Sequence, residues 1–571
     1  GHSVHWHAGK GRQYVVLEIP VGLRVCRLRG RAVPQEIHAN DLTTRIGQKV
    51  NPAVLAPGGG ERRPEAVHQK YVGGHLRVRH CPETIAGRPY GPMCSKGGLQ
   101  IAVLGLGTLR QMAPQRLLVA VGLPLGLLIS LLSPAWTGYD EFTHFARVVD
   151  MAHGNLEPGS EPEGTGSVIP VAHRDATTQI VLDHQAGRAP WTVTSIRGLL
   201  GHRPEGRVTF IDTRPTSAST PVAYLPAALG SLLPVALDAP GVVVLWAGRV
   251  ASLLTYLALA WWAIRSAAAF RWSLTAAALV PLNLALAASV SPDGLTVAAV
   301  LMAVSLWTRV EADETISVPS LVLPMLLLAL AKPPYFLILG LFPLSAVLDW
   351  SRMRARAALI AGGAMAVGLA NTLARSSENY QAATTTMIRQ IEYQPSVQRD
   401  RLLGDLPGFV WATVDTWISE YRFYVQGWFR QLGFWEADLP SVVPWLLAGL
   451  VLVSLLALDG DDLRSFRGAR RGLMGGGVGL LLMAIYAASY VYFTDLSDYG
   501  HVGLQMARYS APLAILAFVS WTPRILGPVA DSIVGRVGRR WAVAAVAGVP
   551  MVAVGASVVT WLWTGANTPL G

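Results

Sequence analysis

Long apolar runs separated by short polar connections dominate the chain from residue 112 to its end. A helix that crosses a bilayer needs about 20 mainly apolar residues. By this measure the pattern predicts an all-α, polytopic membrane protein with about 11 transmembrane helices. The short pair near Lys332 could instead form one broken hairpin around Pro333 and Pro334. We expect spans near 117–135, 241–264, 273–290, 293–310, 319–331, 333–349, 357–374, 441–458, 473–493, 507–523 and 541–563.

Arginines in the short connections predict how the helices are oriented, because cytoplasmic loops carry an excess of basic residues. They recur on alternate connections, for example at 352–356, 464–471 and 536–540. This places the start of the membrane domain in the cytoplasm and its end outside. The alternation holds only if 221–237 does not cross, and its two prolines favour an interfacial or re-entrant helix.

Two long segments then lie outside, at 136–240 and 375–440, and we expect short amphipathic helices in both. The second is rich in aromatic residues, which prefer the headgroup layer of a membrane. An interfacial helix is the simpler interpretation, and a carbohydrate-stacking surface is the alternative. The aromatic residues are Trp411, Trp417, Tyr421, Phe423, Tyr424, Trp428, Phe429, Phe434 and Trp435.

Composition and charge support the same class of protein. Only 15% of the residues are charged and 51% are hydrophobic, whereas soluble domains average about 25% charged residues. The net charge of +11 comes mainly from residues 1–100, which hold 15 basic and 6 acidic residues, against 32 and 30 in 101–571. The membrane domain is therefore nearly neutral, and we expect no nucleic-acid partner.

Residues 1–110 differ from the rest of the chain. They show no sustained helical or strand periodicity, and they contain all three cysteines, Cys26, Cys81 and Cys94. Met112 directly precedes the first apolar run, as the start of a membrane protein would. We therefore expect 1–110 to be a disordered extension or an over-extended reading frame, and 111–571 to be the multipass domain.

The first outer segment opens with a group of polar residues directly after a predicted span. If a helix starts here, Asp140, His144 and Arg147 share one face, and Glu141 lies on the adjacent flank. Acids in a first helical turn also favour the helix dipole, so a simple cap with a solvated face is the competing interpretation. The position at the outer headgroup level favours a functional site.

Three cations depart from the cytoplasmic pattern of basic residues. Arg249 lies in the outer half of its span, Lys332 on an outer turn, and Arg508 at the outer start of another span. Charged groups beside hydrocarbon are usually paired or functional, and Arg and Lys bind phosphate oxygens by charge-assisted hydrogen bonds. We expect the three to converge on a lipid-phosphate site. Asp293 is either a partner for one of them or a helix cap, and the cap is favoured.

Six short motifs occur in an order that resembles a family of bacterial multipass membrane proteins, the domain of unknown function 2142 family. More distantly, the chain resembles the GT-C superfamily of lipid-dependent glycosyltransferases. The resemblance covers roughly 115–525, and it departs from the family at Met506-Ala507, where a glycine is expected. The motifs are Gly138-Tyr139-Asp140-Glu141-Phe142-Thr143-His144-Phe145, 221–230, Ser291-Pro292-Asp293-Gly294, Ala331-Lys332-Pro333-Pro334-Tyr335, 432–440 and Ala507-Arg508-Tyr509-Ser510-Ala511-Pro512.

The GT-C resemblance implies transfer of a sugar from a polyprenyl-phosphate donor to an extracytoplasmic acceptor such as a cell-envelope glycan, lipid or protein. It implies a bacterial inner-membrane protein whose active face is outside. An acid early in the first outer loop would be the base, which maps to Asp140, with Glu141 secondary and His144 as orienting residue. A divalent cation is an open alternative, and no nucleotide or redox cofactor is expected. Donor phosphate binding is assigned to Arg147, Arg249, Lys332 and Arg508, and substrate or structural roles to Asp293, Tyr224, Tyr509 and Trp435.

Two other classes of function fit the same pattern. A flippase or exporter of lipid-linked glycans also needs many spans and outward-facing cations, although the hydropathy shows no internal repeat of the kind many transporters have. A non-catalytic membrane scaffold would use its outer loops to bind partners. Replacement of Asp140 by Asn should abolish a transferase, leave a scaffold intact, and affect a flippase only if Asp140 lies on the transport path.

Overall fold

The computed structural model describes two separate units of the chain, 1–92 and 93–571. Within the first unit, three strands form an antiparallel meander of β1 (Ser3–Gly9), β2 (Arg12–Ile19) and β3 (Gly22–Arg27). The sequence pattern did not indicate these strands. The described residues are 3–9, 12–19, 22–27, 112–161, 164–185, 191–213, 216, 219–376, 394–433, 439–466, 468–494, 500–502, 507–522 and 526–564.

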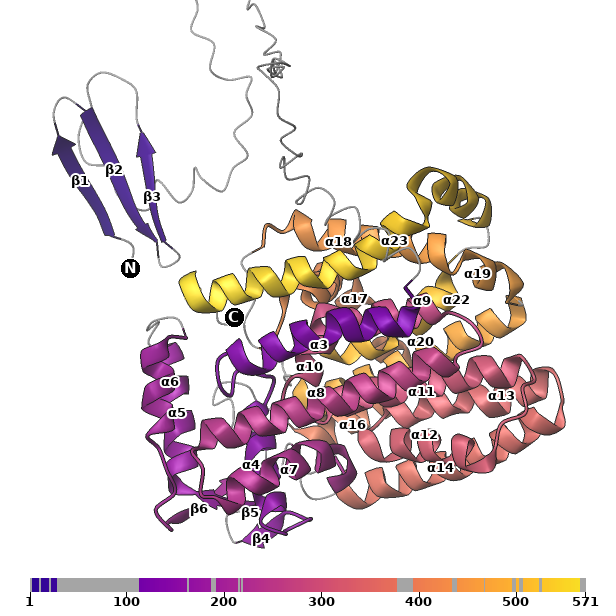
Figure 1. Cartoon of the computed structure of the whole chain (residues 1–571), viewed down its shortest axis with the longest axis horizontal. Coiled ribbons are helices and arrows are strands. Elements are labelled where there is room, and N and C mark those ends of the chain that lie inside the picture. Colours follow the sequence, from indigo (N-terminus) through magenta and orange to yellow (C-terminus); the bar gives the residue numbers. More distant parts are fainter. Residues whose placement is uncertain are drawn as a thin grey trace, which may run out of the picture. The chain divides into compact units, whose positions relative to one another are not determined.

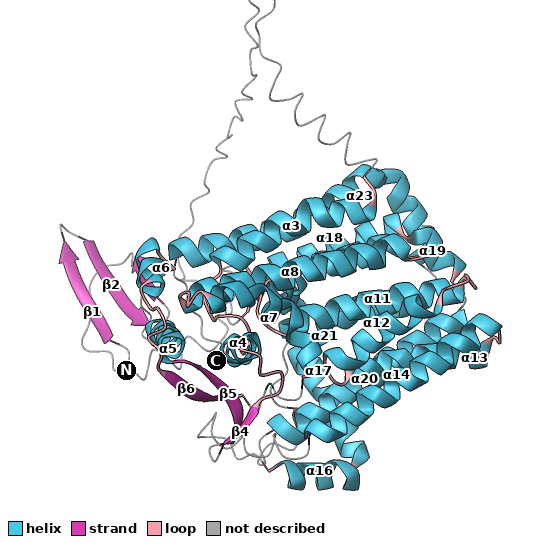
Figure 2. Cartoon of the chain, turned by 60° about the horizontal axis from the view of Figure 1, so that its bottom comes forward, coloured by secondary structure: helices cyan, strands magenta, loops and turns pink. Residues whose placement is uncertain are grey.

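Six helices among the described residues are long and apolar enough to cross a membrane. They are α3 (Pro114–Leu132), α8 (Gly241–Ser266), α11 (Asp293–Glu311), α14 (Arg352–Ser376), α20 (Gly468–Phe493) and the second part of α23 (Leu526–Val559), with η5 (Thr560–Thr564) following it. In two views the long helices α3, α8, α11 and α14 run side by side (Figures 1 and 2).

The expected count of eleven spans is not confirmed, because several predicted spans are broken or short. Pro281 ends one helix and starts the next, so 273–290 becomes α9 (Arg271–Leu279) and α10 (Pro281–Ala287). Other apolar segments are α12 (Val318–Ala331), α13 (Leu341–Leu348) after the 3₁₀ helix η3 (Tyr335–Gly340), and α18 (Val442–Leu458). The stretch from 507 is divided into α21 (Ala507–Ser510), η4 (Ala511–Leu513) and α22 (Ala514–Trp521).

Helix α11 is the central helix of the membrane domain, since 94% of its apolar window is buried by the rest of the protein. Glycines allow the helices around α11 to pack closely against one another. Between α3 and α8, a Cβ on Gly126 of α3 would lie only 2.4 Å from a methyl carbon of Leu253 on α8. The segment α7 (Pro221–Ala236) packs along α8 in the same way through Gly230, where a Cβ would lie 2.4 Å from that of Ala251.

The segment 136–240, which we expect outside and call the first outer segment, adds a small sheet to a membrane domain that is otherwise predominantly helical, as expected. It contains α4 (Glu141–Ala152), α5 (Val171–Gln185), α6 (Val193–Leu200) and a small antiparallel sheet of β4 (Gly159–Glu161), β5 (Gly164–Pro170) and β6 (Val208–Asp212). In both views these elements gather at one end of the long helices (Figures 1 and 2). Phe145, Val149, Ile169 and Trp191 form a core of their own with residues of α7 and α8.

The segment 375–440, which we expect outside and call the second outer segment, contains α16 (Pro395–Gly404) and the 25-residue helix α17 (Leu406–Arg430). At the opposite end of the bundle, the short helix α19 (Gly460–Ser465) follows α18. Here the buried carboxylate of Asp459 accepts hydrogen bonds from the amides of Trp272 and Ser273, which caps the start of α9. These contacts join the last third of the chain to the central helices.

Candidate functional site

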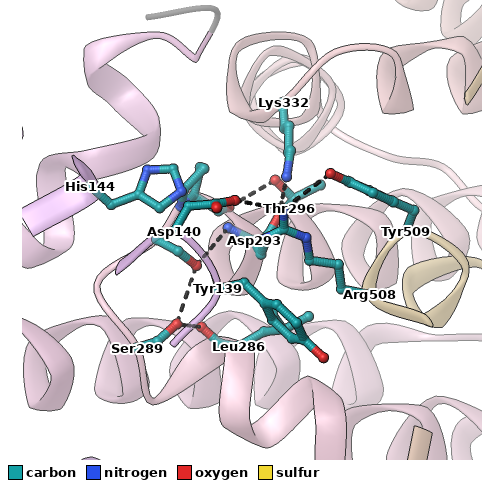
Figure 3. Close-up of polar contacts among 12 residues, drawn as sticks. Tyr139, Asp140, His144, Leu286, Ser289, Asp293, Thr296, Lys332, Arg508 and Tyr509 are labelled. Carbon is teal, nitrogen blue, oxygen red and sulfur yellow. Dashed lines mark hydrogen bonds and ion pairs between the residues drawn. The ribbon is translucent and has the colours of Figure 1, made fainter. Parts of the chain in front are cut away.

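Four charged residues from four separate elements meet at one place, and we call them the charge cluster: Asp140, Asp293, Lys332 and Arg508 (Figure 3). Lys332 Nζ lies 2.5 Å from Asp293 Oδ1, and Arg508 Nη2 lies 2.7 Å from Asp140 Oδ2. Arg508 Nη1 is 3.9 Å from Asp293 Oδ2, so Arg508 lies between the two carboxylates. Two acids and two bases are thus interleaved at one place.

Breaks between helices supply the members of the charge cluster. Asp140 directly precedes α4, and Asp293 is the first residue of α11. Lys332 follows the last residue of α12, and Arg508 lies in the four-residue helix α21. Free backbone groups and polar side chains are concentrated at such helix ends, which is why a polar site can form between otherwise apolar helices.

Arg508 has an unusual environment for a buried cation. Its guanidinium carbon lies 4.8 Å from the ring centre of Tyr139 and 5.0 Å from that of Tyr509, so two aromatic faces hold it. The side chain is only 5% exposed. Nη2 donates to Asp140 and to the Tyr509 hydroxyl, whereas Nε and Nη1 have no hydrogen-bond partner. Buried donors without partners carry a cost, so these two nitrogens are suited to an anionic ligand.

Asp140 is the accessible carboxylate of the charge cluster, with 35% of its side chain exposed against 8% for Asp293. Its backbone is left-handed (φ 54°), a conformation that Asp and Asn tolerate better than other non-glycine residues. Burial opposes ionisation, but the charge of Arg508, with smaller contributions from His144 when it is protonated in acid and from Lys332, outweighs it and holds the pKa of Asp140 below its usual value. The side chain is therefore ionised at neutral pH.

His144 follows Asp140 by one helical turn, as the sequence pattern predicted, and its ring is buried. Its Nδ1 lies 2.9 Å from the hydroxyl of Tyr224, which in turn donates to the carbonyl of Thr216. Burial lowers the pKa of His144 to about 4, although Asp140 acts in the opposite direction. His144 is therefore neutral at physiological pH, and its contact with Tyr224 orients the ring.

Glu141 and Arg249 form a separate, enclosed ion pair, which corrects two of the expected site roles. Arg249 Nη2 lies 2.5 Å from Glu141 Oε2, and both side chains are at most 1% exposed. The remaining Arg249 donors bind the carbonyls of Ser130, Ser133 and Pro134. Arg249 thus has no N–H left for a phosphate and does not join the charge cluster.

Both carboxylate oxygens of Glu141 already accept hydrogen bonds. In addition to Arg249, its oxygens accept hydrogen bonds from the amides of Gly138 and Val290. A carboxylate that is buried and bonded through both oxygens cannot reach an acceptor hydroxyl. Its place in the fold is structural, because it fixes the loop before α4 against α8 and against the residues that precede α11.

Arg147 is also directed away from the charge cluster, although it was expected to bind phosphate. Its Nη1 donates to the carbonyl of Asn155 at 3.2 Å, and its Nη2 donates to the carbonyl of Leu156. Glu157 lies 3.9 Å away and is bonded by Arg375 at the end of α14. Arg147 therefore holds the loop that follows α4.

The other expected residues divide into two groups. Tyr509 joins the site: its ring lies 5.3 Å from Lys332 Nζ, and its carbonyl accepts a hydrogen bond from Tyr335. Trp435 lies outside the described residues. Sequence reasoning did not assign roles to Tyr139 and Tyr335, although both belong to the short motifs on which the family resemblance rests. Within the described ranges, no group of three or more His, Cys, Asp or Glu side chains could hold a metal ion.

A comparison with protein families gives one match. The model described as "Predicted membrane protein (DUF2142)" matches residues 123–517, which is more than half of the chain and includes the whole charge cluster. Neither the curated proteins nor the solved structures contain a match. The family resemblance seen in the short motifs is thereby confirmed, and the chain belongs to the DUF2142 family of predicted membrane proteins.

Proposed function

We propose that this protein is a membrane glycosyltransferase that moves a sugar from a polyprenyl-phosphate donor to an extracytoplasmic acceptor. One observation carries the proposal: an accessible, ionised carboxylate lies next to a buried arginine that has two donor nitrogens without a hydrogen-bond partner. The first group can accept a proton, and the second can bind a phosphate. Both lie beside apolar helices along which a polyprenyl chain can extend.

The donor phosphate is bound by Arg508 and Lys332 in this proposal. Arg508 offers Nε and Nη1, which have no hydrogen-bond partner. Lys332 uses one contact for Asp293, and an ammonium group has three N–H donors. Asp293 holds Lys332 beside Arg508 in the absence of a ligand. Arg147 and Arg249, whose donors are directed elsewhere, take no part.

Asp140 is the proposed general base. An acceptor hydroxyl attacks C1 of the sugar while its proton passes to Asp140, and the C1–O bond to phosphate breaks with its electron pair on the phosphate. A single displacement of this kind inverts C1. The polyprenyl phosphate that leaves carries one more negative charge, which Arg508 and Lys332 stabilise. A positioned carboxylate of this type contributes about 10²–10⁴-fold in rate.

The test is a transfer assay in proteoliposomes with a panel of short-chain polyprenyl-phosphate sugars, in which the release of polyprenyl phosphate is measured. We expect Asp140→Asn to lower the rate by about 10²-fold or more in a protein that still folds, since Asn tolerates the left-handed backbone at this position. Asp175→Asn, on the exposed surface of α5, is the matched control. Full activity of Asp140→Asn with a donor that the wild type uses would exclude Asp140 as base.

The same preparation separates the alternative functions. A flippase would move a fluorescent polyprenyl-phosphate sugar across the vesicle bilayer without releasing polyprenyl phosphate. A scaffold would do neither. If a donor binds and is either flipped without release of polyprenyl phosphate or neither flipped nor cleaved, the transferase proposal is wrong.

A further inference from the structure

The guanidinium of Arg508 already binds the carboxylate of Asp140, and it is also able to bind the phosphate of the donor. Resting on the proposed function, we propose that the donor phosphate displaces Asp140 from Arg508, so that donor binding itself releases the carboxylate that acts as base. Without donor, Asp140 is held by the cation and is a poor proton acceptor. The site then becomes reactive only when the donor is in place.

The geometry of Arg508 makes this exchange favourable. Asp140 contacts it through a single oxygen, with Nη2 at 2.7 Å from Oδ2, and Nη2 is also bonded to the Tyr509 hydroxyl at 3.1 Å. A phosphate can bind two guanidinium nitrogens at once, and such paired contacts are stronger than single ones. Because Nε and Nη1 have no hydrogen-bond partner and Nη1 is 3.9 Å from Asp293, a phosphate gains hydrogen bonds that neither carboxylate makes.

The position of the guanidinium is fixed independently of Asp140. Tyr139 and Tyr509 enclose it through their ring faces at 4.8 and 5.0 Å. Tyr139 is itself fixed by a hydrogen bond from its hydroxyl to Gln431, and the carbonyl of Tyr509 by one from Tyr335. Asp140, in contrast, is 35% exposed and can turn towards water or an acceptor. The carboxylate is therefore the partner that moves.

Loss of Arg508 changes the proton affinity of Asp140 in a definite direction. The groups that face Asp140 are Arg508, His144 and Lys332, with Asp293 on the far side of Arg508. His144 is neutral and Lys332 is paired with Asp293, so Arg508 is the main opposing charge. A bound phosphate neutralises that charge and adds a negative one nearby. Both changes raise the pKa of Asp140 and make it a stronger base.

The experiment measures the protonation of Asp140 directly and requires no sugar. Dicyclohexylcarbodiimide reacts with protonated carboxyl groups, so mass spectrometry of the peptide that contains Asp140 gives the labelling midpoint as a function of pH. The probe is farnesyl phosphate in detergent, with uncharged farnesol as control, and its binding is followed separately by thermal stabilisation. We expect saturating farnesyl phosphate to raise the midpoint by about one pH unit or more, and farnesol to leave it unchanged.

Variants test whether Arg508 is the residue that exchanges Asp140 for the phosphate. Arg508→Gln should show a raised midpoint without ligand and no further rise with farnesyl phosphate. Arg422→Gln, which removes an exposed arginine of α17, is the matched control and should behave as wild type. If Arg508→Gln does not fold, Lys332→Met gives the second test: it should weaken farnesyl phosphate binding several-fold, yet the midpoint should still rise at saturation.

The outcomes separate this inference from the proposed function. Binding of farnesyl phosphate without a rise in the midpoint overturns the exchange, and so does a failure of farnesyl phosphate to bind. If the protein transfers sugar but the midpoint does not rise, the function stands and the exchange is wrong. If the midpoint rises but no donor in the panel supports transfer, the exchange stands and the transferase is wrong.

Discussion

Glu141 and Arg249 show how a buried charge can serve the fold rather than the chemistry. The two side chains are fully enclosed and 2.5 Å apart, and each also satisfies backbone groups of the loop before α4. Removal of one partner from such a pair leaves an uncompensated charge, which costs about 3–5 kcal/mol. Asp140, one residue earlier, is partly exposed and makes no comparable set of contacts. Replacement of Glu141 by Gln should therefore destabilise the protein more than replacement of Asp140 by Asn.

We expect Glu141→Gln and Arg249→Gln each to lower the thermal unfolding temperature of the detergent-solubilised protein, and by more than Asp140→Asn, because Asp140 is 35% exposed and makes fewer contacts. The double variant should lose less than the two single losses added together, by a coupling of about 0.5–3 kcal/mol, because it leaves neither charge alone. Equal unfolding temperatures for Glu141→Gln and Asp140→Asn would show that the Glu141–Arg249 pair is not structural.

His144 predicts a dependence of stability on pH. Its pKa is about 4 in the folded protein, lowered from 6.5 mainly by burial. Below pH 6.5 the unfolded chain therefore takes up a proton that the folded protein does not, and stability falls as the pH decreases from about 6.5 towards 4, by up to about 1.4 kcal/mol per pH unit. His144→Gln should show a smaller fall in unfolding temperature between pH 7.5 and 5. A fall as large as that of wild type would show that His144 is not the source.

The sequence predicted part of this residue-level arrangement. Helical spacing predicted different faces for Asp140 and Glu141, but in the structure Asp140 precedes α4 with a left-handed backbone, so their different surroundings come from this break and not from helical spacing. It did not identify the partner of Glu141, because Arg249 is 108 residues away and only the packing of α4 against α8 brings them together. Arg147 shows the same limit of sequence reasoning. We expected it to bind phosphate, but in the structure it donates to the carbonyl of Asn155 in the loop after α4.

At the scale of elements, several predicted spans are divided where a proline or a polar turn interrupts an apolar run. Hydropathy averages over these positions, so 273–290 was expected as one helix although Pro281 divides it. The interruptions matter for function, because three members of the charge cluster lie at ends of apolar helical segments, at Asp293, Lys332 and Arg508. The short motifs in the sequence coincide with these breaks. The sequence could not show that their charged residues lie together, because that depends on how the helices pack.

Helix α17 gives a prediction of its own. Its exposed face includes Trp411, Ile418 and Tyr421, which are 68%, 67% and 45% exposed. A helix with large exposed aromatic and aliphatic side chains and several charges is suited to the headgroup layer. A spin label on Trp411→Cys, with the three native cysteines replaced by serine, should lie closer to the headgroups than one on Val367→Cys within α14. Equal depths, or a label wholly in water, would contradict the interfacial position.

At the scale of the whole membrane domain, the two ends of α11 carry opposite kinds of polar structure. Asp293 at its start belongs to the charge cluster, and Glu311 at its end binds Arg470 at 2.6 Å. A helix of 19 residues is about 28 Å long, close to the roughly 30 Å of a hydrocarbon core. We therefore expect the charge cluster and the arginine-rich end, where Arg354 and Arg470 contact Glu311, to lie on opposite sides of the bilayer.

The arginine-rich end should face the cytoplasm, because positive residues are retained there, and the charge cluster should then face outward. A cysteine at Ser465, in α19, is expected to resist an impermeant maleimide in intact cells and to react in inside-out vesicles. A cysteine at Thr178, on the exposed surface of α5, should show the reverse. Labelling of Ser465→Cys in intact cells would place Asp140 on the cytoplasmic side, where an extracytoplasmic acceptor could not reach it, and the proposed transferase would be excluded together with the orientation.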